Sequence, residues 1–155
     1  FHRLGRALTG YLEFASSSRS TVALSAITKH VSDRLEPRLK DVVTDLNQAM
    51  RRRENADRLD TDKLLAAVSG VYLLATVRDC RDSLALNTVF EQAWNQSGQA
   101  LEIHIQRNMD LFRQNPDDPN TMARLDAVIK MAQVRFTPEY AETLRRARHA
   151  AERRN

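Results

Sequence analysis

The four histidines are the side chains of this chain best suited to hold a metal or to move a proton. They are His2, His30, His104 and His149. None has another histidine or a cysteine four residues away, and no Glu-x-x-His pair occurs. Helical zinc and di-iron sites depend on such spacings, because residues three or four apart share one face of a helix. The sequence therefore predicts neither a metal centre nor a bound cofactor.

His104 lies at the edge of an apolar seam that runs from Trp94 to Ile105. Buried polar groups of proteins are usually hydrogen-bonded, so we expect a structural histidine there. The alternative is a ligand bound in the bundle interior. The pocket would then lie between the most apolar segment and the seam, and its lining would include Tyr72, Trp94 and His104.

Cys80 is the single cysteine, which excludes an intrachain disulfide and a thiolate zinc site. It stands between two Arg-Asp pairs, and neighbouring guanidinium groups can stabilise a reactive thiolate. Residues one position apart on a helix point in different directions, however. On a helix Cys80 shares a face with Leu73, Val77 and Leu84, so we expect a small core residue.

No pattern of catalytic residues is visible in the chain. It contains no glycine-rich phosphate loop, no Gly-x-Ser-x-Gly elbow and no dinucleotide fingerprint. Paired carboxylates for acid–base catalysis would have to converge from different helices. The acids placed to do so are Asp79, Asp82, Glu91 and Glu102. The sequence predicts a protein that is not an enzyme.

Arginine dominates the charged residues. The chain carries 24 basic side chains, only four of them lysines, and a formal net charge of +4. Guanidinium groups bind carboxylates and phosphates through a planar pair of hydrogen bonds. The expected partner-binding residues are Arg51, Arg52, Arg53, Arg145, Arg146, Arg148 and Arg153. The arginine excess also fits the codon usage of a GC-rich genome, which favours a bacterial source.

Apolar residues recur every three or four positions along most of the chain, as in amphipathic helices. The pattern predicts helices within 22–50, 64–77, 90–112, 122–136 and 137–151. The segment 64–77 is apolar on nearly every side and is expected in the middle of a bundle. With four glycines and four prolines, the chain has too few turn-forming residues for a sandwich or barrel.

Further residues predict where these helices begin and bend. A short helix is expected at 2–14 and loops at 55–57 and 115–120. Ser20, Asp60 or Thr61, and Thr137 are expected caps, and Thr88 with Glu91 matches a capping box. Pro37 predicts a kink or a short break, although the apolar stripe keeps its phase across it. Gly70 predicts close approach of a neighbouring helix. Gly98 predicts at most a bend in the helix expected within 90–112.

These patterns predict an all-α, single-domain bundle over 1–155, with five or six mostly antiparallel helices and a central apolar helix at about 62–80. The absence of an initial Met indicates a processed chain or part of a longer one. No apolar run reaches the ~20 residues of a membrane span, so a soluble chain is expected, with the cytoplasm favoured.

The functional hypothesis is a protein–protein interaction or assembly module. It would bind acidic or amphipathic surfaces, or a second copy, through its arginine-bearing faces and its last helix. That helix has a narrow apolar stripe of Tyr140, Leu144, Ala147 and Ala151. Two alternatives remain: a regulatory domain that binds a small molecule, and binding of nucleic acid or anionic lipid through the basic C-terminal helix.

Overall fold

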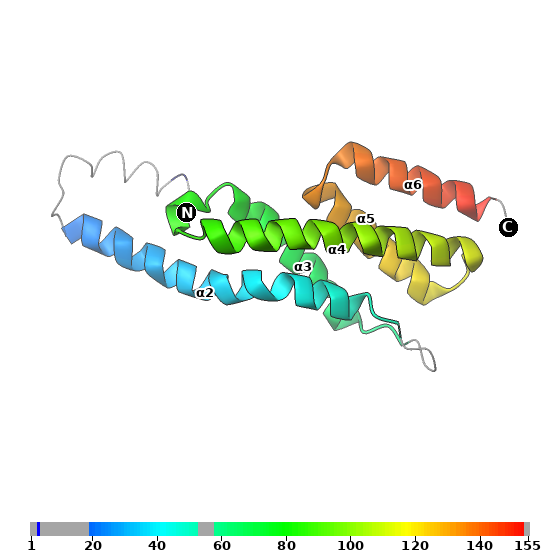
Figure 1. Cartoon of the computed structure of the whole chain (residues 1–155), viewed down its shortest axis with the longest axis horizontal. Coiled ribbons are helices and arrows are strands. Elements are labelled where there is room, and N and C mark those ends of the chain that lie inside the picture. Colours follow the sequence, from blue (N-terminus) through cyan, green and yellow to red (C-terminus); the bar gives the residue numbers. More distant parts are fainter. Residues whose placement is uncertain (1–2, 4–18, 53–57, 154–155) are drawn as a thin grey trace.

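The computed structural model is all-helical in the residues it describes, which are 3, 19–52 and 58–153 (Figure 1). Its elements are α2 (Arg19–Ala49), α3 (Thr61–Arg78), a 3-10 turn η1 (Asp82–Leu84), α4 (Asn87–Gln114), α5 (Pro119–Arg135) and α6 (Pro138–Glu152). The described residues thus confirm the predicted all-α bundle. The helix expected at 2–14 and the loop expected at 55–57 lie outside them.

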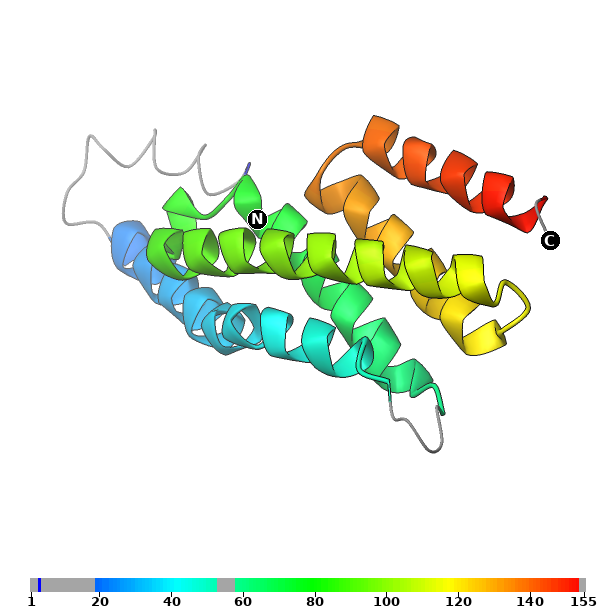
Figure 2. The ribbon, with the colours of Figure 1, turned by 45° about the vertical axis from the view of Figure 1, so that its right-hand side comes forward.

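Successive helices alternate in direction, as the colours along the ribbons show (Figures 1 and 2). Helix α2 packs on α3 and α4, and α5 packs on α3 and α4 as well. Helix α6 lies on α5 and touches α4. No helix in the described part of the chain is long and apolar enough to cross a membrane.

One hydrophobic cluster joins all five helices. The side chains of Phe90 and Phe112 on α4 are almost fully buried in it. Helix α2 contributes Leu39, Val42 and Leu46, the residue after it contributes Met50, and α5 contributes residues from Leu125 to Ala132. Packing of apolar stripes holds these helices together, as the sequence pattern predicts.

Helix α2 continues through Pro37, so the proline does not end it. Pro37 is exposed, and it removes one backbone hydrogen bond from the helix. The apolar side chains on both sides of Pro37 stay on one face, and Leu35 and Leu39 both contact the core. Retention of this common face favours a single helix.

Gly70 marks the closest approach of α3 to α2, as predicted. A Cβ atom at this position would lie 3.2 Å from Cγ2 of Val42. Glycine costs about 1 kcal/mol relative to alanine inside a helix. The close contact between the two helices offsets that cost.

The capping box predicted at Thr88 and Glu91 is wrong. A cap at Thr88 would start the helix at Val89, but α4 begins two residues earlier, at Asn87, and its N-cap Leu86 makes no side-chain capping bond. The preceding turn ends at Ala85 in the left-handed conformation (φ 52°). Leu84 and Leu86 are both buried, so burial of these leucines determines where the helix starts.

The caps expected at Asp60 and Thr137 are confirmed, whereas the cap expected at Ser20 is wrong because α2 already begins at Arg19. Asp60 accepts a hydrogen bond from the backbone N–H of Lys63 at 3.1 Å. Thr137 does the same for Tyr140 at 3.1 Å, and Pro138 occupies the first turn of α6. Asp118 caps α5 through the N–H groups of Asn120 and Thr121. Side-chain oxygens satisfy the free N–H groups at these helix starts.

Candidate functional site

The side of α3 that faces away from its neighbours is the main surface left open by the packing. Helix α3 buries Ala67, Val71, Leu74 and Val77. Its exposed residues between Lys63 and Arg78 are Leu65, Ala66, Ser69, Tyr72 and Thr76, here called the outer face of α3. No charged residue occurs between Lys63 and Arg78, so this exposed face carries no charge.

Two large side chains dominate the outer face of α3. Leu65 is 64% exposed and Tyr72 is 45% exposed. Residues 65, 69, 72 and 76 follow at intervals of four and three, which places them in one stripe. Helix α3 thus contacts three other helices, as a central helix should, yet one of its sides faces solvent. A helix that is apolar all round is normally covered on every side.

The structure separates the three residues of the predicted ligand pocket. Tyr72 is on the outer face of α3, whereas Trp94 and His104 belong to α4. Ten residues separate these two along α4, a rise of about 15 Å. Trp94 is half-buried and stacks on Phe90 with ring centroids 5.5 Å apart. The groove found among the described residues is lined by none of the three.

His104 is 9% exposed and joins α4 to α2. Its Nε2 lies 2.8 Å from Oδ1 of Asn47. Because that oxygen only accepts, Nε2 carries the proton, and Nδ1 is left buried without a hydrogen bond. Burial lowers the pKa of His104, and the charge of Arg107 lowers it further. The imidazole is therefore kept neutral and serves as a hydrogen-bonded link between two helices.

Trp94 is held by Arg135 from the end of α5. Nε and Nη2 of Arg135 donate to the Trp94 carbonyl at 3.1 and 2.8 Å. The guanidinium carbon lies 4.0 Å from the centroid of the indole ring. Gly98 leaves room for this arginine, since a Cβ atom there would lie 2.8 Å from Cζ of Arg135. Burial lowers the pKa of Arg135.

Most of the arginines expected to bind partners form ion pairs within the chain. Arg52 lies 3.4 Å from Asp118. Arg145 and Arg146 both approach Glu142, at 3.3 and 3.6 Å. Arg148 pairs with Asp126 and with Glu152. Arg51 and Arg153 are exposed, and Arg53 lies outside the described residues.

The Arg148–Asp126 ion pair, unlike the pairs within α6, joins the last helix to α5 and supplements its narrow apolar stripe. Leu144 and Ala151 are buried, Tyr140 and Ala147 are half-buried, and Arg148 lies over the Phe112 ring at 5.7 Å. Arg145 also donates to Gln133 at 2.7 Å. The arginines of α6 thus help to hold this helix on α5 and α4.

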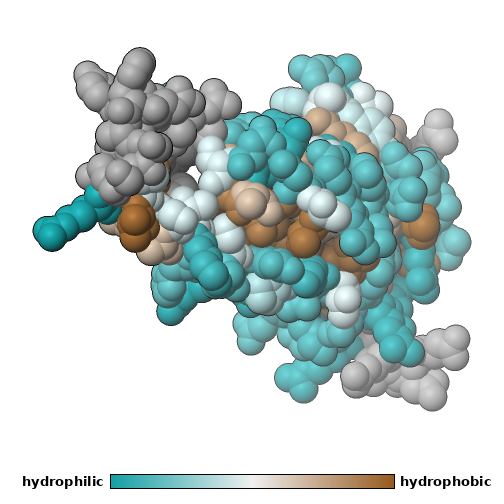
Figure 3. Space-filling model, turned by 60° about the vertical axis from the view of Figure 1, so that its left-hand side comes forward, coloured by the Kyte–Doolittle hydropathy of each residue, from teal (hydrophilic) through white to brown (hydrophobic). Residues whose placement is uncertain are grey.

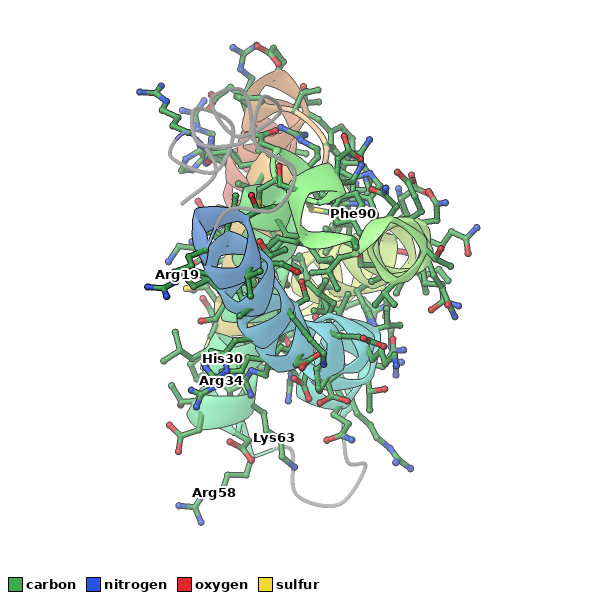
Figure 4. The ribbon with its side chains drawn as sticks, turned by 90° about the vertical axis from the view of Figure 1, so that its left-hand side faces the viewer. Arg19, His30, Arg34, Arg58, Lys63 and Phe90 are labelled. Atoms are coloured by element: carbon green, nitrogen blue, oxygen red, sulfur yellow. The ribbon has the colours of Figure 1, made fainter. Side chains whose placement is uncertain are left out.

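A second group of nitrogen-bearing side chains lies on one side of the bundle. Viewed along the long axis, Arg19, His30 and Arg34 of α2 share a side with Arg58 and Lys63 (Figure 4). Fifteen residues separate Arg19 from Arg34, which corresponds to about 22 Å of helix. These side chains are spread along the molecule, and this spacing does not build an anion pocket.

Of the acids named as candidates for catalysis, Asp82 and Glu91 come together at Arg81, whereas Glu102 lies eleven residues further along α4 than Glu91. Cys80 is partly buried against the core, and burial, followed by the charge of Asp79, raises the pKa of its thiol. Glu91 and Asp82 each approach Arg81, at 3.7 and 4.0 Å. Within the described ranges, no group of three or more His, Cys, Asp or Glu side chains is arranged to hold a metal ion.

An open groove of about 720 Å³ lies on α4, beside the corner that joins α5 to α6. Its lining residues are Glu102, Ile103, Gln106, Phe136, Thr137 and Tyr140. The Phe136 and Tyr140 rings meet edge to face, with centroids 5.5 Å apart. The sequence pattern does not reveal this groove, because Phe136 fits the apolar stripe that faces the core.

Comparison of the chain with family models, with curated proteins and with solved structures finds no match. The exposed surfaces of the described residues are therefore the guide to function. The space-filling view shows apolar residues in a broken band across one face, bordered by hydrophilic ones (Figure 3). The exposed large apolar side chains among the described residues are Val22, Ile27, Leu65, Tyr72 and Ile103.

Proposed function

We propose that this chain is a protein–protein interaction module that binds an amphipathic helix of a partner on the outer face of α3. The observation that carries the proposal is the exposure of Leu65 and Tyr72 on a helix without charge from Leu64 to Val77. Burial of a leucine side chain contributes about 1.5–3 kcal/mol. A partner that covers this face gains that free energy.

A helix is the partner element that best fits the outer face of α3. Ala66 and Ser69 are small and lie beside the larger Leu65 and Tyr72. Side chains of alternating size form ridges and grooves into which a second helix packs. The hydroxyl groups of Ser69 and Tyr72 can form hydrogen bonds at the edges of such a contact, whereas the Thr76 hydroxyl donates to the Tyr72 carbonyl at 2.9 Å.

The proposal moves the interaction surface away from the C-terminal helix. Arg145, Arg146 and Arg148 have carboxylate partners inside the chain. The carboxylates beside these arginines reduce the positive potential that α6 presents to a polyanion. This arrangement supports the protein-interaction hypothesis over binding of a polyanion by α6.

Photocrosslinking tests the proposal directly. A photoreactive benzoylphenylalanine replaces Tyr72 in the full chain, which is expressed in cells that normally make it. We expect one defined adduct, and we expect Leu65→Glu in the same chain to abolish it. The partner is then identified and purified, and its affinity is expected to fall at least tenfold on Leu65→Glu.

Ile103→Glu provides the matched control. Ile103 is 67% exposed, close to the value of Leu65, but lies on α4 outside the outer face of α3. Exposed substitutions of this kind change stability by about 0.5 kcal/mol or less, so both variants should remain folded. An adduct that persists with Leu65→Glu, or an equal loss with Ile103→Glu, contradicts the proposal.

A further inference from the structure

The groove between α4 and the α5–α6 corner has the size and lining of a small-molecule site, and α3 does not contribute to it. Its volume of about 720 Å³ falls inside the range of roughly 300–1,000 Å³ that is common for ligand pockets. Ile103, Phe136 and Tyr140 form apolar walls, and Glu102, Gln106 and Thr137 add polar groups. Such sites combine apolar walls with a few polar groups in this way.

The corner that forms one wall of the groove is fixed to α4. Phe136 follows Arg135, whose two hydrogen bonds to the Trp94 carbonyl anchor the end of α5. Thr137 caps α6 through the backbone N–H of Tyr140. These contacts fix both rings relative to α4 before any ligand binds. A preformed wall reduces the entropy that a ligand must lose on binding.

The charge of the groove indicates which ligands it accepts. Glu102 is the single charged residue among the six that line it. Arg135 is near enough to act on Glu102 electrostatically, but its Nε and Nη2 donate to the Trp94 carbonyl. The described residues offer Glu102 no ion pair within 4.0 Å. Its carboxylate oxygens can therefore accept hydrogen bonds from a cationic ligand.

The aromatic rings of the groove also favour a positively charged ligand. A cation over the face of a tyrosine or phenylalanine ring is attracted by its quadrupole. Arg135 already lies 5.2 Å from the Phe136 centroid. Tyr140 has no cation–π contact with any described side chain. Its ring is thus available beside Glu102 in the same groove.

We infer that the groove binds a small organic ammonium ion carried on an apolar body. The apolar body packs against Ile103 and Phe136, and the ammonium group lies between Glu102 and the Tyr140 ring. A neutral alcohol of the same shape can donate one hydrogen bond to the carboxylate but brings no positive charge to offset its desolvation. A carboxylate ligand would be repelled by Glu102.

Three compounds of one shape test this inference: 4-phenylbutylamine, 4-phenylbutan-1-ol and 4-phenylbutyrate. Each is titrated at pH 7 into the isotope-labelled chain, and amide chemical shifts are followed by NMR. We expect the amine to shift residues 102–106 and 136–140. The alcohol should bind roughly tenfold more weakly, as expected when a charged hydrogen bond is lost, and the acid should not bind. Equal affinity for amine and alcohol, or no localised shifts up to about 10 mM, overturns the inference.

Glu102→Gln separates the charge from the shape of the groove. It should weaken binding of the amine roughly tenfold and should not weaken binding of the alcohol, which no longer desolvates a carboxylate. Glu91→Gln is the same change elsewhere on α4, where the carboxylate faces Arg81. It should leave the affinities for the amine and for the alcohol unchanged. Unchanged amine affinity in Glu102→Gln overturns the inference. Leu65→Glu should bind the amine normally, so the result is independent of the partner surface on α3.

Discussion

The guanidinium group of Arg135 occupies the space that a side chain at position 98 would fill. A Cβ atom at Gly98 would lie 2.8 Å from Cζ of Arg135. The same guanidinium donates twice to the Trp94 carbonyl and lies 4.0 Å from the centroid of the indole ring. Glycine inside α4 and arginine at the end of α5 therefore depend on each other.

This dependence predicts that the effect of Gly98→Ala changes sign with the residue at position 135. With Arg135 present, alanine displaces the guanidinium and should destabilise the protein by about 1–2 kcal/mol, because charged hydrogen bonds are lost. With Arg135→Ala, the same change should stabilise it by up to about 1 kcal/mol through helix propensity. Urea unfolding of the four proteins measures both values. Stabilisation by Gly98→Ala in both backgrounds would refute the coupling.

His104 predicts a loss of stability between neutral and mildly acidic pH. Burial keeps the pKa of His104 below its unfolded value of about 6.5, so the unfolded state binds more protons. The stabilisation is present above pH 6.5 and is lost as the pH falls through 6.5 towards the folded pKa. Urea unfolding from pH 8 to pH 5 should show this fall, and His104→Gln should flatten it. If the free energy of unfolding falls equally with pH in His104→Gln, another group causes the loss of stability.

Asp118 is predicted to be the most sensitive cap in the bundle. It accepts hydrogen bonds from Thr121 and from the Asn120 N–H, and Arg52 lies 3.4 Å away. Asp118→Ala should cost about 1–2 kcal/mol of unfolding free energy. Asp117→Ala, which changes an exposed neighbour, should cost about 0.5 kcal/mol or less. Similar losses from the two variants would show that the cap contributes little.

The same aspartate predicts a second transition at lower pH. The hydrogen bond from the Thr121 hydroxyl, and then the backbone N–H groups, hold the pKa of Asp118 below its ordinary value. Its contribution is present above pH 4 and is lost as the pH falls through the folded pKa. The thermal unfolding temperature should therefore fall more steeply between pH 5 and pH 2 in the parent chain than in Asp118→Asn.

Cys80 is predicted to react slowly with alkylating agents. Burial raises the pKa of its thiol, and the thiolate is the reactive form. Iodoacetamide at pH 7 should modify the folded chain more slowly than the unfolded chain in urea. Quantitative modification of the folded chain at the unfolded rate would indicate an activated thiolate instead.

The helices themselves were predictable because their signals are local. The stripe on α2 keeps its phase across Pro37, and Asp60 and Thr137 have the side chains that cap a helix. The start of α4 was not predictable in this way, since Thr88 and Glu91 imitate a cap. Its position depends on the burial of Leu84 and Leu86 by distant parts of the chain.

The surfaces were harder to predict than the helices. The apolar composition of α3 indicates a buried helix, and no local pattern shows that one side, with Leu65 and Tyr72, stays exposed. The arginines of α6 resemble a binding face, but their carboxylate partners include Asp126, which lies on another helix. Both properties depend on how helices far apart in sequence come together.

Thiol labelling in cells tests the central claim, that a partner covers the outer face of α3, most directly. Leu65→Cys and Val22→Cys are made separately in a Cys80→Ser chain, and maleimide labelling rates are compared between cells that normally make the protein and the purified chain. Val22 is 69% exposed on α2 and belongs neither to the outer face of α3 nor to the groove. We expect the thiol at position 65 to be labelled rapidly when purified and at least tenfold more slowly in cells, with position 22 labelled at least half as fast in cells as when purified. Equal labelling of position 65 in both settings would contradict the claim.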